Sequence, residues 1–265
     1  MNREDLEKSI QTALEKGAQE ELETLSKEAV ETYPEESFGY AYLAEALLMS
    51  SPVPYSKAEL CLAKASQLEP ENSNYLAQFA HLKSHQGEEG LAQILWGKII
   101  GMEPGHVEAL LAKGIYQLEN NSDYEQSLEL FNQVIEHNMD HVQSYLYRAK
   151  SYVGLDEYEK ALNDLNHFYQ LNGGVKDVDG LLVELAVRTG LDQLESIVDV
   201  YHALLEFESD NPQLHMNCAQ ILVQLERHEE AAEHYGKVSE AFEHKNALIA
   251  FNWGESLRKT GQYAE

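Results

Sequence analysis

The sequence predicts an all-α fold, a right-handed superhelical solenoid of stacked antiparallel helix pairs. The first observation is the segment 144–171, where apolar and small residues recur at helical spacing in two runs separated by Gly154-Leu155-Asp156. The second is that this pattern returns about every 34 residues. Because two short amphipathic helices cannot cover both of their apolar stripes alone, each pair needs neighbours of the same kind.

Small residues mark the positions where helix backbones are expected to approach closely. In the predicted first helices they are spaced by 34, 34 and 35 residues, at Ala46, Ala80, Gly114 and Ala149. The second helices carry an equivalent column at Ala58, Ala92, Ser127 and Ala161, followed four residues later by Leu62, Trp96, Phe131 and Leu165. Helix ends coincide with Pro70 and Pro104. In this order of residues the chain resembles the tetratricopeptide repeat (TPR) family.

The resemblance covers essentially the whole chain, which is expected to be one TPR-like solenoid over 1–265. The strongest matches are Glu159-Lys160-Ala161-Leu162 and the pair Trp253-Gly254 with Gly261-Gln262-Tyr263. The expected repeats are 3–36, 39–72, 73–106, 107–141, 142–175, 176–211, 212–246 and a partial repeat at 247–265. The first repeat is rich in glutamate, as suits a terminal repeat with a polar outer face.

Irregular points follow in chain order. Pro52 and Pro54 exclude helix from the loop inside the second repeat, and the fourth repeat gains one residue near Asn120-Asn121. Gly173-Gly174 ends a helix, so 173–176 is expected to be either a flexible join or a looser turn before a short helix at about 178–189. Near the end, Phe251, Trp253 and Leu257 would lack the covering second helix of an eighth repeat. We therefore expect a longer array, or self-association through this end.

Charge and composition limit the kinds of partner. The 265 residues include 46 acidic and 19 basic ones, a net charge of −27. The acidic side chains either keep an outer face solvated or attract a basic partner. They disfavour nucleic acid as a partner, because binding to phosphates needs clustered Lys and Arg. No apolar run is long enough for membrane insertion, and the charged start is unlike a secretion signal. Cys61 and Cys218 lie in distant repeats, so both are expected to be reduced thiols of a cytoplasmic protein.

Sequence motifs give no support for catalysis. Gly97-Lys98 lacks the remaining residues of a phosphate loop, and two distant cysteines make no zinc motif. The best histidine pair for a metal is His81 and His85, four residues apart on one helix face, while His228 and His234 are expected to face apart. We therefore expect no enzyme activity, no cofactor and no bound metal.

The family resemblance implies a protein-binding scaffold whose concave groove is lined by the first helix of each pair. A preformed groove lowers the ordering cost of binding a peptide, and its mixed lining suits a basic or amphipathic one. Carried over by phase, the expected partner-binding residues are Tyr40, Leu43, Leu47, Asn74, Ala77, His81, Leu111, Ile115, Leu146, Lys150, Met216, Gln220 and Phe251.

Other functions stay open at this point. One branch of the family grips acidic chaperone tails through groove Lys and Asn, but here Asn74, His81, Lys113 and Lys150 are scattered through an acidic protein. A peptide-sensing regulatory module of a larger protein is the main alternative to a scaffold. A metal-dependent enzyme with a site in the groove, at His81 and His85, is the less favoured one.

Overall fold

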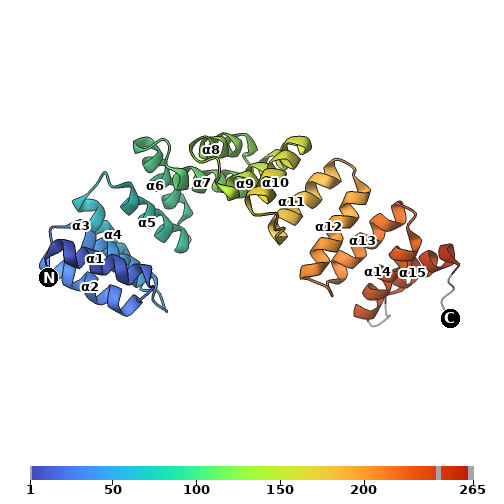
Figure 1. The fold of residues 1–265 in the computed structure, drawn as a ribbon, viewed down its shortest axis with the longest axis horizontal. Coiled ribbons are helices and arrows are strands. Elements are labelled where there is room, and N and C mark those ends of the chain that lie inside the picture. The colour runs from blue at the N-terminus through green and yellow to red at the C-terminus, as the bar shows by residue number, and fades with distance from the viewer. Residues whose placement is uncertain (1, 243–245, 262–265) are drawn as a thin grey trace. The chain divides into compact units, whose positions relative to one another are not determined.

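The computed structural model describes residues 2–242 and 246–261, which contain fifteen α-helices and no strand (Figure 1). The helices alternate between first and second members of antiparallel pairs. They are α1 Arg3–Glu15, α2 Gln19–Thr32, α3 Ser37–Leu48, α4 Tyr55–Leu68, α5 Ser73–His85, α6 Glu89–Met102, α7 Val107–Tyr116, α8 Tyr124–His137, α9 Val142–Gly154, α10 Tyr158–Leu171, α11 Val178–Gly190, α12 Leu194–Phe207, α13 Pro212–Gln224, α14 His228–Ala241 and α15 Ala247–Thr260.

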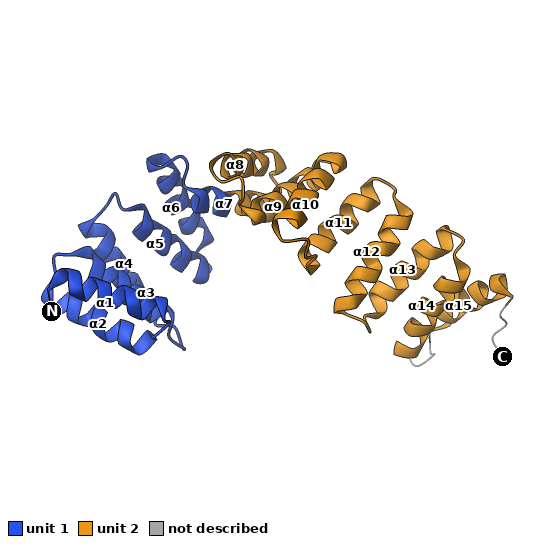
Figure 2. Cartoon of the chain, viewed as in Figure 1, with its two compact units in different colours: residues 1–113 blue, residues 114–265 orange. Residues whose placement is uncertain are grey.

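The chain forms two compact units, residues 1–113 and 114–265 (Figure 2). Their boundary falls within α7. The expected join at 173–176 lies inside the second unit, between α10 and α11, where both Gly173 and Gly174 have positive φ. The single array over 1–265 and a hinge at Gly173-Gly174 both stay predictions. Residues 262 and 263 of the expected eighth-repeat motif lie outside the described residues.

A left-handed residue recurs at the turn inside most of the helix pairs. Glycine occupies it at Gly17 and Gly87, where the absence of a Cβ makes a positive φ inexpensive. The later turns have residues with a Cβ, for which the same conformation is sterically unfavourable by roughly 1–2 kcal/mol. These are Ser122, Asp156, Asp192 and Glu226, with φ between 52° and 59°. The turn is therefore imposed by the packing of the two helices rather than by glycine alone.

The columns of small residues form the packed core. Ala46, Ala80 and Ala149 of the first helices are fully buried, as are Ala58, Ala92, Ser127 and Ala161 of the second helices. The large side chains that follow, Leu62, Trp96, Phe131 and Leu165, are at most 2% exposed. The small-residue pattern read from the sequence is therefore confirmed as a packing pattern.

Two local expectations have clear structural outcomes. The extra residue expected near Asn120-Asn121 is taken up by a π-helical turn, η1, at Gln117–Asn121, where a wider helical turn accommodates one more residue. The first helix of the sixth pair, α11, begins at Val178 and ends one residue beyond the expected range of about 178–189. Its 13 residues match the length of α1, α5 and α9, so describing it as short is wrong. The side chain of Asp177 caps its start by accepting a hydrogen bond from the backbone nitrogen of Gly180 at 2.8 Å.

Close approach between pairs depends on glycine where α3 meets α2. A Cβ added at Gly39 would lie 2.9 Å from the backbone nitrogen of Val30 and 3.0 Å from the Cβ of Ala29. Helix backbone cannot move aside as a flexible side chain can. Gly97, in the middle of α6, differs, since the nearest atom to an added Cβ is the Lys113 Nζ at 3.8 Å.

We expect Gly39→Ala to destabilise the chain by about 1–3 kcal/mol, because an overpacked helix contact must open. Gly97→Ala, the matched control, should instead stabilise it by roughly 0.5–1 kcal/mol, because alanine loses less backbone entropy in a helix. Urea unfolding followed by circular dichroism measures both changes. Equal shifts of the two midpoints would contradict the close packing of α2 and α3.

Candidate functional site

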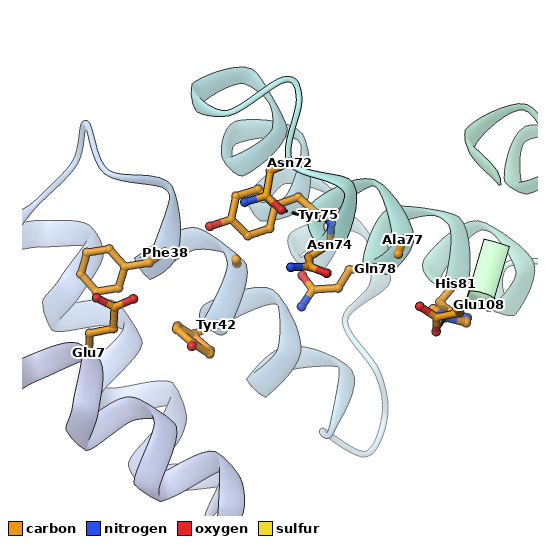
Figure 3. A pocket seen from close by; sticks show the side chains of 11 residues that line it. Glu7, Phe38, Tyr42, Asn72, Asn74, Tyr75, Ala77, Gln78, His81 and Glu108 are labelled. Atoms are coloured by element: carbon orange, nitrogen blue, oxygen red, sulfur yellow. Dashed lines mark hydrogen bonds and ion pairs between the residues drawn. The ribbon is translucent and has the colours of Figure 1, made fainter. Parts of the chain in front are cut away.

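A cleft of about 410 Å³ lies within the first unit, on the side formed by the first helices of successive pairs (Figure 3). Glu7 comes from α1 and Glu108 from α7, and the remaining residues belong to α3 and to α5 with its N-cap. The full lining is Glu7, Phe38, Ala41, Tyr42, Asn72, Asn74, Tyr75, Ala77, Gln78, His81 and Glu108. No second helix contributes to this lining.

The floor of the cleft is apolar and fixed by core packing. Phe38, Ala41 and Ala77 are each about 5% exposed or less, so their side chains close the cleft from below. Phe38 packs with the first helix pair, and the guanidinium of Arg3 lies 5.2 Å from the centre of its ring. Small alanine side chains here leave the open space that the polar residues surround.

A hydrogen-bond network holds Tyr75 and Asn72 in place. The Ser37 hydroxyl donates to the Glu69 carboxylate, so the Tyr75 hydroxyl must donate to the Ser37 Oγ, 2.9 Å away. Asn72 donates to the same carboxylate at 2.8 Å. The hydrogen bond from Ser37, followed by that from Asn72, holds the pKa of Glu69 below its ordinary value. Partial burial raises the pKa of Tyr75, so its hydroxyl stays a proton donor at neutral pH.

His81 and Glu108 form the other end of the cleft. The His81 Nε2 lies 2.7 Å from the Glu108 Oε1, and this hydrogen bond lowers the pKa of the carboxyl group. The His81 ring also meets the Trp96 ring edge to face, with centres 4.9 Å apart. Neither His81 nor His85 belongs to a group of three potential metal ligands within the described ranges. A metal ion held by His81 and His85 would therefore have no third protein ligand among the described residues.

The cleft presents hydrogen-bond acceptors and negative charge. Figure 3 shows Glu7 and Glu108 at its two ends, with the amides of Asn74 and Gln78 between them. None of the described residues lining it is a lysine or an arginine. Such a lining can accept hydrogen bonds from peptide N–H groups and can attract cationic side chains, but it repels anions.

A smaller hollow of about 260 Å³ occurs in the second unit, again on first helices. It lies between α9 and α11 and is lined by Lys150, Val153, Asp179, Leu182, Val183 and Ala186. Its lining is more apolar, and Leu182 is 50% exposed. The first helices of both units thus carry a concave surface, with different chemistry in each.

The residues expected from sequence phase are only partly brought together. Asn74, Ala77 and His81 line the large cleft, and Lys150 lines the smaller hollow. Leu47 and Leu146 are 8% and 2% exposed and pack into helix-pair cores, so their side chains face inward rather than into a groove. The others line neither hollow: Tyr40, Leu43, Leu111, Ile115 and Met216 are partly buried, while Gln220 and Phe251 are exposed.

The prediction from equivalent repeat positions did not include Phe38, Tyr42, Tyr75 and Gln78, and the reason is geometric. A cleft between two neighbouring first helices is lined by one face of the earlier helix and by a different face of the later one. Copying a single phase from repeat to repeat selects the same face every time. The aromatic residues Phe38, Tyr42 and Tyr75 in helices with a small-residue column were the available signal.

Solved structures of other proteins share this fold. No protein-family model matches the chain, and no curated protein matches it. Among solved structures, the C-terminal part of a TPR repeat-containing protein from Cytophaga hutchinsonii is similar with a TM-score of 0.70 and 11% identity, covering 93% of this chain and 98% of that one. PilF from Pseudomonas aeruginosa gives a TM-score of 0.67 and 17% identity, covering 77% and 91%.

A third similar structure is YrrB, described as a TPR protein with an unusual peptide-binding site. Its TM-score is 0.59 at 17% identity, covering 72% of this chain and 95% of that one. These similarities confirm the fold class: the chain has the all-α fold of TPR proteins, built from stacked antiparallel helix pairs. Among the described helices, none combines the length and the apolar character needed to cross a membrane.

We expect the Glu108 carboxyl to titrate at a lower pH in the native chain than in a His81→Ala variant. The depressed pKa means that the contact stabilises the fold above the ordinary carboxyl pKa and is lost as pH falls through the lower folded value. Carboxyl ¹³C NMR measures this. Glu59, whose pKa is lowered by a hydrogen bond from Lys83, is the internal control and should not move. An unchanged Glu108 titration would contradict the His81 contact.

Proposed function

We propose that this protein is a non-catalytic scaffold that binds a basic peptide segment of a partner protein in the cleft of the first unit. The observation that carries the proposal is the lining itself. Ten residues from the first helices and the N-cap residue Asn72 converge on one concave space, with a carboxylate at each end. A surface with this shape binds an extended chain without having to fold first, so little of the binding energy is lost to ordering.

The polar groups of the cleft fit a peptide backbone. The side-chain amides of Asn74 and Gln78 project between the two carboxylates and can both donate to carbonyls and accept from N–H groups. The Gln78 Oε1 is buried and has no hydrogen-bond partner within the described residues. Peptide binding in a TPR fold has a structural precedent in YrrB, which is described as having a peptide-binding site.

The charged and aromatic groups favour lysine or arginine in the peptide. Glu7 and Glu108 supply carboxylates, and Tyr42 and Tyr75 supply rings against which the aliphatic stem of a basic side chain can pack. The net charge of −27 adds long-range attraction for such a segment. An acidic peptide would meet like charge in the same place, which sets the direction of selectivity.

The test is a selection of decapeptides from a random library on the full chain, followed by affinity measurements on two charge-reversed variants. Glu7→Lys/Glu108→Lys places the change in the cleft. Glu28→Lys/Glu31→Lys makes the same change in net charge on exposed positions of α2, outside the cleft lining. We expect basic peptides that lose at least about tenfold in affinity with the cleft variant, roughly 1.4 kcal/mol, and much less with the control.

Two results would overturn the proposal. One is a selection dominated by acidic or purely apolar peptides. The other is an equal loss of affinity in both variants, since that would mean that net charge and not the cleft is recognised. Repeating the measurement at high salt separates the two contributions, because long-range attraction is screened while contacts inside the cleft are screened less. Circular dichroism of each variant checks that it is folded.

A further inference from the structure

Three consecutive helices of the second unit bring together a cluster of histidine and cysteine side chains. His202 comes from α12, His215 and Cys218 from α13, and His234 from α14. One donor atom each from His202, Cys218 and His234 can be chosen so that no two are more than 4.8 Å apart. In the sequence Cys218 lies 16 positions from each of these histidines, so adjacent antiparallel helices carry the three donors to one place.

The hydrogen bonds of His215 fix which nitrogen of His234 is free. The His215 Nε2 lies 2.9 Å from the backbone carbonyl of Ser209, which can only accept, so this nitrogen carries the proton. The His215 Nδ1 is then an acceptor, and it lies 2.8 Å from the His234 Nδ1, which must donate. The lone pair of His234 is therefore on Nε2, directed at the Cys218 Sγ 3.7 Å away.

This is the arrangement that metal-binding histidines have in proteins. One ring nitrogen faces the ligand set while the other donates a hydrogen bond that orients the ring. The His202 ring stacks on that of His234, with centres 5.5 Å apart and planes 10° apart.

The distances suit a tetrahedral ion. Bonds of about 2.3 Å to sulfur and about 2.0–2.1 Å to nitrogen place neighbouring tetrahedral ligands about 3.6 Å apart. The separation of 3.7 Å between the Cys218 Sγ and the His234 Nε2 is close to this value. His202 is exposed, so its side chain can rotate to shorten the remaining separations without disturbing the core.

We propose that His202, Cys218 and His234 bind a zinc ion, with His215 as the residue that positions His234. The ion would bond to the Cys218 thiolate, and the thiol proton would pass to solvent on binding. A fourth position on the exposed His202 side would be taken by water or by a group from a partner. Bound in this way, zinc ties α12, α13 and α14 to one another and so fixes two successive helix pairs.

Cobalt is the probe for this site, because Co²⁺ takes the same tetrahedral ligands and reports them by absorption. The full chain, freed of metal by a chelator and kept reduced, is titrated with Co²⁺ alone and then with Zn²⁺. We expect one equivalent to give thiolate-to-cobalt charge transfer and intense visible bands, both abolished by Zn²⁺. Cys218→Ser should lose the charge-transfer band, while Cys61→Ser, the matched control, should keep it.

Two further variants guard against a folding artefact. His202→Ala changes an exposed residue and should weaken zinc binding without unfolding the chain. His215→Phe keeps a ring but removes the hydrogen bond to His234, so zinc affinity should fall about 10–100-fold. The proposal is overturned if the native chain gives no charge-transfer band, if Cys61→Ser loses it as Cys218→Ser does, or if His202→Ala binds zinc as the native chain does.

Discussion

The structure depends on the close approach of helices at small residues. A single helix pair has two apolar stripes and too little chain to cover them, so each pair is stable only against its neighbours. Ala46, Ala80 and Ala149 permit that contact, and at Gly39 even a methyl group would meet the backbone of α2. Because the first helices are held side by side in this way, a concave surface of fixed shape forms within each unit.

The chemistry of the molecule follows from which helix faces this packing leaves free. In the first unit the free faces carry Glu7, Glu108 and the amides between them, so the cleft accepts hydrogen bonds and positive charge. In the second unit the helices meet with His202, Cys218 and His234 at their contacts. The proposed peptide cleft and the proposed zinc site use different helices and different residues, so either can be tested without the other.

Sequence periodicity predicted the helices and the core well, because a repeat of about 34 residues samples the same packing position many times. It predicted the cleft poorly. Asn74, Ala77 and His81 line it as expected, but Leu47 faces the core, since α3 is apolar on nearly every side and its phase cannot be read. Leu146 faces the core as well, with 2% of its surface exposed. The cluster of His202, Cys218 and His234 was not predicted, because its residues come from three helices and share no local motif.

The most direct test of the peptide-binding claim is amide hydrogen exchange of the full chain with and without a selected basic peptide. Binding in the cleft predicts slower exchange in α3 and α5, whose residues form most of the lining. Amide exchange in α4 and α6, the second helices of the same pairs, should not change, because the peptide would not contact them. Protection confined to those second helices, or to the second unit, would contradict the account.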